Sequence, residues 1–357
     1  MSRRRVDVAV VGLGLAGSAA AREVARRGHR VAAFEAYAPG HRKGSSHGRS
    51  RIFRRAYDDP MYVELTGRAG RLWMDLTETS GEPVFRLTGE LDAWTDPETL
   101  AEVMTDGQVP VELLSAGAAG RRWPEFTFDQ PVVFHPEAGV IDPDLAISVM
   151  VRDAIAAGAV VAYNTPVTAL EPEDGGVVVR GGSVEYVADT VIVAAGPWLG
   201  PLLGSLVDLP PLAVTQQQVF FFRPRDPRVE WPNFTLGDIY GLPEGELVKV
   251  SEHGQGTPTT ADGRSGVIDA ASRKRVTEFV RDRVPGLHPE PVGALSCLYT
   301  STPDEDFILD RSGPFVVCSP CSGHGAKFAP LVGELAADLA EERGSALPRF
   351  ALSRFAG

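Results

Sequence analysis

The sequence has few cysteines, no excess of positive charge and no long apolar run. Three cysteines in 357 residues do not suit a disulfide framework, so we expect a protein of the reducing cytoplasm. A formal net charge of -12 supplies no basic field, and neither nucleic acid nor a membrane surface is expected as a partner. No apolar stretch is long enough to cross a bilayer. These absences favour a soluble protein that acts on a small molecule.

A dinucleotide-binding pattern occupies the start of the chain. Gly12, Gly14 and Gly17 directly follow the apolar run 8–11, and Glu35 ends the next apolar stretch. Gly12 allows a tight turn, Gly14 lets the backbone approach a pyrophosphate, and Gly17 lets a helix pack closely on the strand. Glu35 can accept a hydrogen bond from a ribose hydroxyl. The order of strand, glycines, helix and acid predicts a nucleotide site with phosphates at the helix N-terminus.

The same stretch has an alternative interpretation as a secretion signal. Three arginines at 3–5 precede the nearly uncharged run 8–21, as in signal peptides. Asp7 and the glycine spacing argue against a signal. Cleavage would also remove the phosphate loop and leave the strand at 31–35 without its neighbours, so we prefer the nucleotide site.

The length of the chain predicts two lobes, because single cores stop growing below this size. We expect helices at 144–157 and 331–342, and strands of a nucleotide-binding lobe at 8–11, 31–34, 160–163, 177–180, 190–195 and 315–317. Strands at 219–222 and 247–250, separated by turns rich in proline and glycine, predict an antiparallel sheet. We assign residues 1–85, 140–209 and 295–357 to the nucleotide-binding domain, and 86–139 and 210–294 to a substrate domain.

Two polar clusters remain outside this pattern. The loop 44–57 carries several cations among glycines and serines, and it is either a ligand site or a solvated surface loop. The segment 321–328 precedes the second predicted helix, so its amides and Lys327 can face an anion or a flavin carbonyl. An ordinary glycine turn with a capping lysine is the alternative. We expect no bound metal.

Six motifs in order resemble those of the monomeric sarcosine oxidase and N-methyltryptophan oxidase family, within the larger group that includes D-amino acid oxidase. They are VVGLGLAG at 10–17, GSSHGRSRIFRRAY at 44–57, VIVAAGPW at 191–198, IYGLP at 239–243, CLYTSTPDEDFILD at 297–310 and SGHGAKFAPLVGE at 322–334. The resemblance implies FAD rather than NAD. It also implies an α/β fold in which a Rossmann-type FAD-binding domain carries an inserted antiparallel-sheet substrate domain.

The resemblance assigns cofactor-binding residues beyond the glycine loop. Cys297 occupies the place of the cysteine that holds the flavin 8α position through a thioether, and Ser46, Gly323 and Gly325 would also contact the cofactor. Without the resemblance, Cys297 would be interpreted as a buried small hydrophobe. Cys318 and Cys321 have the spacing of a redox motif, but we interpret them as packing residues.

The resemblance also assigns catalytic and substrate-binding residues. Lys249 would lie over flavin N5 through a water and activate oxygen, since a fixed cation stabilises superoxide. His253 would be the active-site histidine, and Arg51 and His47 would belong to the shell around the flavin. Arg54 and Lys327 would bind the substrate carboxylate as a bidentate fork and a point charge. Tyr240 and Tyr299 would line the cavity. From the residues alone, Lys249 could equally be an exposed strand lysine, and His253 and the tyrosines could be structural.

The implied reaction is oxidation of a secondary or cyclic amino acid. A neutral amine would lose a hydride equivalent to the flavin, the resulting imine would hydrolyse, and O2 would be reduced to hydrogen peroxide. No carboxylate base is expected beside these residues, which favours hydride transfer from the free amine. Ala326 stands where many relatives carry phenylalanine, so the substrate is expected to be larger than sarcosine.

Two competing classes stay open at this point, and both use the same glycine motif. One is a flavin-dependent dehydrogenase that passes electrons to a protein or quinone instead of O2, which Lys249 argues against. The other is a nicotinamide dehydrogenase or a nucleotide-binding regulatory protein. For the oxidase we expect a monomer.

Overall fold

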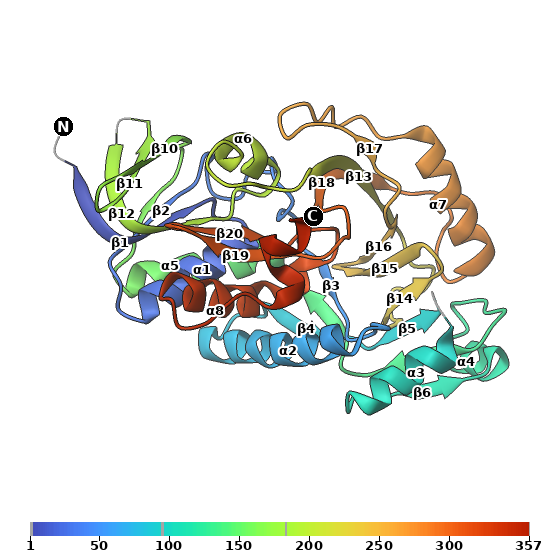
Figure 1. Ribbon diagram of the computed structural model, residues 1–357. Helices are drawn as coiled ribbons and strands as arrows, with labels where there is room; N and C mark the ends of the chain where they lie inside the picture. The colour runs from blue at the N-terminus through green and yellow to red at the C-terminus, as the bar shows by residue number, and fades with distance from the viewer. Residues whose placement is uncertain (1–2, 94–95, 183, 357) are drawn as a thin grey trace.

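The computed structural model describes residues 3–93, 96–182 and 184–356. Two large β-sheets lie side by side, each with helices packed on it, and a small third sheet lies near the place where they meet (Figure 1). The chain passes between the two large sheets several times. Each sheet is therefore built from segments that are far apart in the sequence.

The first sheet has a parallel centre in the order β12-β1-β2-β9. Strands β10 and β11 extend one edge in antiparallel fashion, β20 pairs in parallel with β12, and β19 pairs with β20. Among the described residues its strands are β1 (Arg4–Val11), β2 (Val31–Phe34), β9 (Val160–Ala162), β10 (Val167–Glu173), β11 (Gly176–Gly181), β12 (Val184–Val193), β19 (Ile308–Ser312) and β20 (Phe315–Ser319). Their valine-rich runs suit a sheet that is covered on both faces.

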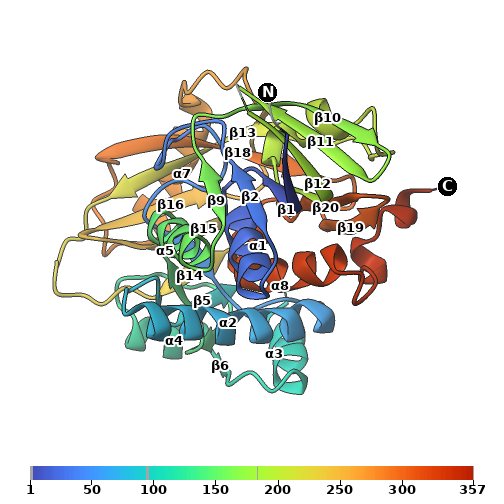
Figure 2. The same cartoon turned by 90° about the vertical axis from the view of Figure 1, so that its left-hand side faces the viewer.

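Three helices cover one face of this sheet: α1 (Leu15–Arg26), α5 (Pro143–Ala156) and α8 (Ala329–Ala340) (Figure 2). Small residues let α1 and α8 approach closely, since a Cβ added at Gly333 would lie 2.7 Å from the carbonyl oxygen of Ala19. The N-terminus of α1 is thereby held at the carboxyl end of β1, which is where open α/β sheets bind ligands. No helix in the described ranges is long and apolar enough to cross a membrane.

The second sheet runs in the order β17-β13-β16-β15-β14-β5-β7-β6, and β18 also pairs with β13. All of its pairs are antiparallel except β14 with β5. Its strands in the described ranges are β5 (Glu90–Ala93), β6 (Glu112–Leu114), β7 (Val132–His135), β13 (Ala213–Phe222), β14 (Asn233–Leu236), β15 (Ile239–Glu244), β16 (Leu247–Glu252), β17 (Thr257–Pro258) and β18 (Gly293–Ser301).

Helix α7 (Ala270–Arg283) packs against β13 and β16. Val248 and Val250 of β16 join Val276 and Val280 of α7 in one apolar core. Because successive strand residues point to opposite faces, Lys249 points away from this core, toward the first sheet. The alternation of side-chain direction along β16 thus places Lys249 on the face of the sheet opposite the α7 core.

A three-stranded sheet with β8 (Gly139–Ile141) between β3 (Arg51–Phe53) and β4 (Phe85–Leu87) completes the fold. Helix α2 (Pro60–Ser80) begins at Asp59, whose side chain accepts from the N–H of Met61. The remaining helices are α3 (Pro97–Asp106), α4 (Ala116–Arg122), α6 (Leu199–Leu203) and the 3₁₀ turns η1 (Gly196–Trp198), η2 (Gly325–Phe328), η3 (Pro348–Phe350) and η4 (Leu352–Phe355).

The predicted fold class, a Rossmann-type sheet combined with an antiparallel sheet, is confirmed. The helices predicted at 144–157 and 331–342 are α5 and α8, with ends within two residues. The strand predicted at 190–195 is the end of the longer strand β12. The division into two domains stays a prediction, and its expected boundary at residue 295 falls inside β18, which pairs in the second sheet.

Candidate active site

One cavity of about 1480 Å³, lined by residues of both large sheets, contains most of the residues that the sequence singled out. The predicted site residues that line it are Gly12, Gly14, Glu35, Ser46, His47, Arg51, Arg54, Tyr240, Lys249, His253, Cys297, Tyr299, Gly323, Gly325 and Lys327. Gly17 lies behind the wall of the cavity. The structure thus brings together two clusters that are some 270 residues apart in the sequence.

The glycine loop after β1 has a geometry that requires glycine. Gly12 has φ of +90°, and a Cβ at Gly17 would lie 1.8 Å from the Gly12 carbonyl oxygen. Glu35 accepts a hydrogen bond of 2.9 Å from the N–H of Leu13 and lies 3.3 Å from His41. Burial alone would raise the pKa of Glu35, but its hydrogen bonds lower it. An ionised acceptor therefore stands at the end of β2, where a ribose is expected.

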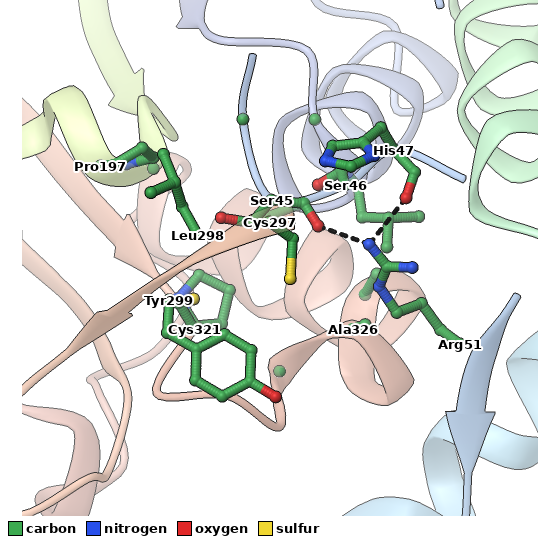
Figure 3. Close-up of a pocket in the computed structure, with 18 of the residues that line it drawn as sticks. Ser45, Ser46, His47, Arg51, Pro197, Cys297, Leu298, Tyr299, Cys321 and Ala326 are labelled. Carbon is green, nitrogen blue, oxygen red and sulfur yellow. Dashed lines mark hydrogen bonds between the residues drawn. The ribbon is translucent and has the colours of Figure 1, made fainter. Parts of the chain in front are cut away.

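The cationic loop 44–57 is part of the cavity wall and not a solvated surface loop. The Ser46 hydroxyl accepts a hydrogen bond of 3.1 Å from the N–H of Leu15, which docks the loop on the start of α1. Arg51 donates to the carbonyls of Ser45 and His47, each at 2.7 Å (Figure 3). Burial, with help from Arg51, lowers the pKa of His47 to about 3, so its ring is neutral.

The second glycine cluster forms the opposite part of the wall. Gly323 has φ of +80°, and a Cβ there would lie 2.5 Å from the ring of Tyr299. At Gly325 a Cβ would lie 1.4 Å from the Pro320 carbonyl oxygen. The main chain therefore approaches these neighbours as closely as only glycine allows, and this tight turn brings Lys327 to the cavity.

Cys297 lies on β18 with its sulfur in the cavity, near Arg51 and Tyr299 (Figure 3). Burial raises the pKa of the Cys297 thiol, while the charges of Arg51 and Lys249 act in the opposite direction. Cys318 is buried in the core, as expected of a packing residue. Cys321 differs from that expectation, because it lines the cavity and its sulfur accepts a main-chain hydrogen bond of 3.3 Å from β18.

Lys249 is buried and its side chain lies in the cavity wall, so it is not an exposed strand lysine. Its amino group donates to the Ser50 carbonyl at 2.5 Å and lies 3.5 Å from the Glu244 carboxylate. Burial, together with the charge of Arg51, lowers the pKa of Lys249 to about 7, although Glu244 acts to raise it. The charge on Lys249 therefore changes close to neutral pH.

Arg54 and Lys327 both lie close to the ring of Tyr57. The Arg54 guanidinium lies 5.6 Å from the centroid of the Tyr57 ring, and the Lys327 amino group lies 5.3 Å from it. Lys327 also donates to the Tyr57 hydroxyl at 3.0 Å. Burial and the neighbouring Arg54 charge hold the pKa of Lys327 well below its usual value. An anion bound beside Arg54 and Lys327 would favour the charged form of the Lys327 amino group.

Aromatic side chains complete this part of the cavity. The rings of His253 and Tyr299 have their centroids 5.8 Å apart, and Tyr240 lines the same wall from β15. Desolvation, with the charges of Arg54 and Lys327, lowers the pKa of His253. Burial raises the pKa of both tyrosines, so both hydroxyls are protonated.

Two carboxylates lie beside the predicted residues, and the expected absence of a carboxylate base stays a prediction. Asp92 of β5 is fully buried and pairs with Arg54 at 2.9 Å. Glu244 of β15 lines the cavity beside Lys249. Both lie on strands whose pairing the sequence did not reveal. Each already contacts a cation, so their position suits a charge partner better than a base.

Four functional candidates were absent from the predicted set: Glu244, Asp92, Tyr57 and His324. Tyr57 ends the loop 44–57, and His324 lies in the SGHG segment. Both therefore stood inside motifs that were already singled out, and each lies three residues from a predicted cation, Arg54 or Lys327. Nothing in the sequence around Asp92 or Glu244 marks either carboxylate.

A Rossmann-type sheet with a glycine phosphate loop, facing a second sheet that carries buried cations, defines a nucleotide-dependent enzyme. Comparison with known proteins narrows this class. Residues 7–339 match the family described as FAD dependent oxidoreductase, so the chain belongs to that family. The expected resemblance and the choice of FAD over NAD are thereby confirmed.

The similar proteins include amino acid oxidases. The N-methyl-L-tryptophan oxidase of Citrobacter koseri is 34% identical over 98% of this chain and 99% of its own. The structure of NikD, an unusual amino acid oxidase essential for nikkomycin biosynthesis, is 28% identical with a TM-score of 0.87, covering 98% of both chains. L-proline dehydrogenase from P. horikoshii has a TM-score of 0.88 at 22% identity over 99% of both chains and shows the shared fold alone.

The residues of the cavity suit FAD. Gly12, Gly14 and the start of α1 provide main-chain amides for a pyrophosphate, and Glu35 provides an acceptor for a ribose. The Ser45 hydroxyl is buried in this wall and has no hydrogen-bond partner within the described ranges. A buried polar atom of this kind is normally satisfied, and a polar cofactor would do so.

Proposed function

We propose that this protein oxidises the C–N bond of a secondary or cyclic amino acid to an imine, with O2 as the electron acceptor and hydrogen peroxide as product. In this proposal FAD is attached covalently through Cys297, and the protein acts as a monomer in the cytoplasm. The observation that carries it is the placement of Arg54 and Lys327 in the same cavity as Lys249 and Cys297.

The two cations provide recognition of an amino acid carboxylate. Arg54 is oriented by Asp92 at 2.9 Å, and Lys327 is oriented by Tyr57 at 3.0 Å. A substrate carboxylate bound beside Arg54 and Lys327 would accept charge-assisted hydrogen bonds from both side chains, in a part of the cavity that is buried. This fixes one end of the substrate and leaves its amine end toward Tyr240 and Tyr299.

The chemistry that bound FAD would supply is acceptance of a hydride equivalent from the substrate and transfer of the electrons to oxygen. Main-chain amides near Gly12 and Gly14, with Glu35, would hold its nucleotide half, and Cys297 would hold its ring half. Lys249, when protonated, places a cation in the wall of the same cavity as Cys297, where it would stabilise negative charge that develops on oxygen. His47, Tyr240 and Tyr299 carry no negative charge that would stabilise the protonated substrate amine. The amine would then react in its neutral form.

The cavity supports a substrate larger than an N-methylglycine. Ala326 precedes Lys327 and lies in the cavity wall (Figure 3), and its methyl group is smaller than the phenylalanine that the resemblance places there. The N-methyl-L-tryptophan oxidases at 34% identity are named for a substrate with a bulky side group. We therefore prefer an N-methyl or cyclic amino acid with a larger side group.

The test measures the hydrogen peroxide that the protein releases with N-methylated, cyclic and primary amino acids whose side chains are matched. We expect the N-methylated or cyclic members to release peroxide in proportion to oxygen consumed. Substrate-dependent reduction of the flavin with slow reoxidation in air would instead indicate a dehydrogenase that uses another acceptor. No reaction with any secondary amino acid would contradict the proposal.

A further inference from the structure

A chain of hydrogen bonds leads from Lys327 to an exposed turn at the mouth of the cavity. Lys327 donates to the Tyr57 hydroxyl at 3.0 Å, Tyr57 contacts His324 Nδ1 at 2.9 Å, and His324 Nε2 contacts the Glu305 carbonyl at 3.1 Å. Tyr57, His324 and Glu305 all line the cavity. The proposed function gives no role to Tyr57 beyond contact with Lys327, and none to His324.

The direction of each hydrogen bond in this chain is fixed. A carbonyl only accepts, so His324 Nε2 carries the proton. Burial, with the charge of Lys327, keeps the pKa of His324 far below its usual value, at about 3. The ring is therefore neutral, and its Nδ1 accepts from the Tyr57 hydroxyl. The Tyr57 oxygen is then left as an acceptor for Lys327.

Aromatic packing holds the two rings in place. His324 lies 4.7 Å from Phe307 and 5.3 Å from Tyr62, measured between ring centroids. Tyr57 stacks on Tyr62 at 5.0 Å with an interplanar angle of 21°. Rings that are packed in this way lose little freedom when a ligand binds, which is the condition for preorganised recognition.

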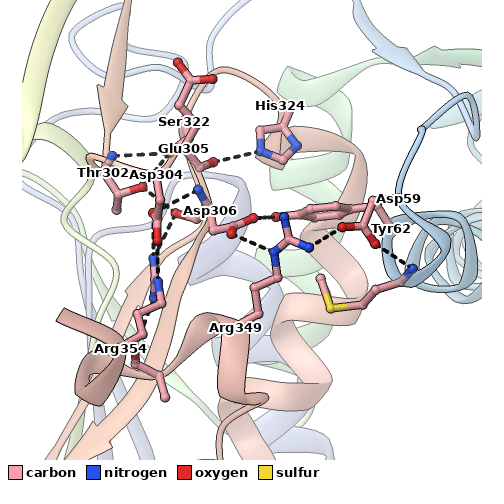
Figure 4. Close-up of polar contacts among 12 residues, drawn as sticks. Asp59, Tyr62, Thr302, Asp304, Glu305, Asp306, Ser322, His324, Arg349 and Arg354 are labelled. Carbon is pink, nitrogen blue, oxygen red and sulfur yellow. Dashed lines mark hydrogen bonds and ion pairs between the residues drawn. The ribbon is translucent and has the colours of Figure 1, made fainter. Parts of the chain in front are cut away.

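The Glu305 carbonyl is itself held by ion pairs of the C-terminal segment. Arg354 pairs with Asp304 at 2.8 Å, and Arg349 pairs with Asp306 at 2.7 Å (Figure 4). Glu305 has φ of +61°, a left-handed conformation that costs free energy unless the surroundings impose it. The turn is therefore fixed on both sides of the residue that anchors His324.

We propose that Tyr57 and His324 are positioning residues that aim Lys327 at the substrate carboxylate, with His324 acting through the Tyr57 hydroxyl. This inference rests on the proposed function. An ammonium has three donors, and Lys327 uses two of them on Tyr57 and on the His324 carbonyl at 3.1 Å. The tetrahedral geometry of the nitrogen then sets the direction of the third.

The chain also influences the charge of Lys327. The charged groups that act on it are Arg54, which lowers its pKa, and Glu90 of β5, which raises it. Tyr57 and His324 are neutral, and the Tyr57 oxygen stabilises the ammonium by accepting a hydrogen bond from it. Loss of that acceptor would lower the pKa of Lys327 further, and carboxylate affinity would then fall at a lower pH than in the unchanged protein.

The experiment measures benzoate affinity of the flavin-loaded protein across pH, from the change in flavin absorption. Benzoate offers one carboxylate and no oxidisable amine. The variants are Tyr57→Phe, His324→Leu, His324→Asn and, as a control at an exposed glutamate that does not line the cavity, Glu290→Gln. We expect Tyr57→Phe and His324→Leu to weaken binding about tenfold, the scale of one lost charged hydrogen bond.

Two further results separate positioning from a general structural effect. His324→Asn keeps an acceptor near the place of Nδ1 and should recover most of the affinity, whereas Glu290→Gln should match the unchanged protein. In Tyr57→Phe the loss of affinity should move to lower pH. Equal affinity and equal pH dependence in all variants would overturn the inference alone. Failure of the unchanged protein to bind benzoate would overturn the carboxylate site and the inference together.

Discussion

The amino group of Lys249 lies 3.5 Å from the carboxylate of Glu244 on the neighbouring strand. Lys249 pairs across the ladder with Leu242, and Glu244 follows two residues later, so both side chains emerge on the same face of the sheet. Burial lowers the pKa of Lys249 to about 7, and Glu244 acts against that shift. The ion pair therefore favours the charged form of Lys249, whereas burial and Arg51 disfavour it.

Replacing Lys249 by methionine should slow the reaction of the reduced protein with oxygen about 10²- to 10³-fold, because a fixed cation no longer stabilises developing negative charge. Reduction by substrate should change less. Stopped-flow measurement of the two half-reactions separates these effects. Lys274→Met is the matched control, since that lysine lies exposed on α7. Equal slowing of both half-reactions in Lys249→Met would contradict the assigned role.

The oxygen reaction should depend on pH through the charge of Lys249. The pKa of about 7 lies below the usual 10.5, so the ammonium is present below about pH 7 and is lost as the pH rises through that value. The rate constant for reaction with O2 should fall over the same range. Glu244→Gln removes the group that raises this pKa, and the fall should then begin at lower pH. An unchanged profile in Glu244→Gln would show that the ion pair does not control this charge.

Gly17→Ala should abolish FAD binding or destabilise the fold, because the new Cβ would lie 1.8 Å from the Gly12 carbonyl oxygen. Such a contact forces α1 away from the glycine loop. Gly120→Ala in α4 is the control, since no atom lies within 4 Å of the added Cβ and alanine favours helix by about 1 kcal/mol. Thermal unfolding and flavin content of both variants provide the measurement. Normal flavin content in Gly17→Ala would be incompatible with this packing.

Cys297→Ser should convert covalent flavin to flavin that dissociates on denaturation, since serine offers no thioether. Acid precipitation of the purified protein gives the readout, with a yellow pellet for attached flavin and a yellow supernatant for released flavin. Cys321→Ser is the control, because that thiol lines the same cavity and should leave the attachment intact. A yellow supernatant from the unchanged protein would rule out the thioether but not FAD itself.

The site could be predicted from the sequence where a motif imposes local geometry. The glycine loop is such a case, since Gly12 has φ of +90° and a Cβ at Gly17 would meet the Gly12 carbonyl oxygen of the same loop. Asp92 could not be predicted, because its approach to Arg54 depends on the place of β5 in the second sheet, whereas Glu244 approaches Lys249 through the hairpin of β15 and β16. The parallel pairing of β14 with β5 is likewise a long-range feature with no local signal.

Anaerobic mixing of the purified protein with N-methyl-L-tryptophan, followed by admission of air, tests the central claim most directly. The account predicts that the visible flavin absorption is bleached by the amine, that air restores it, and that hydrogen peroxide appears on recovery. Cyclic amino acids serve as the second substrate class in the same measurement. A protein that contains flavin but is not reduced by any secondary or cyclic amino acid would contradict the account.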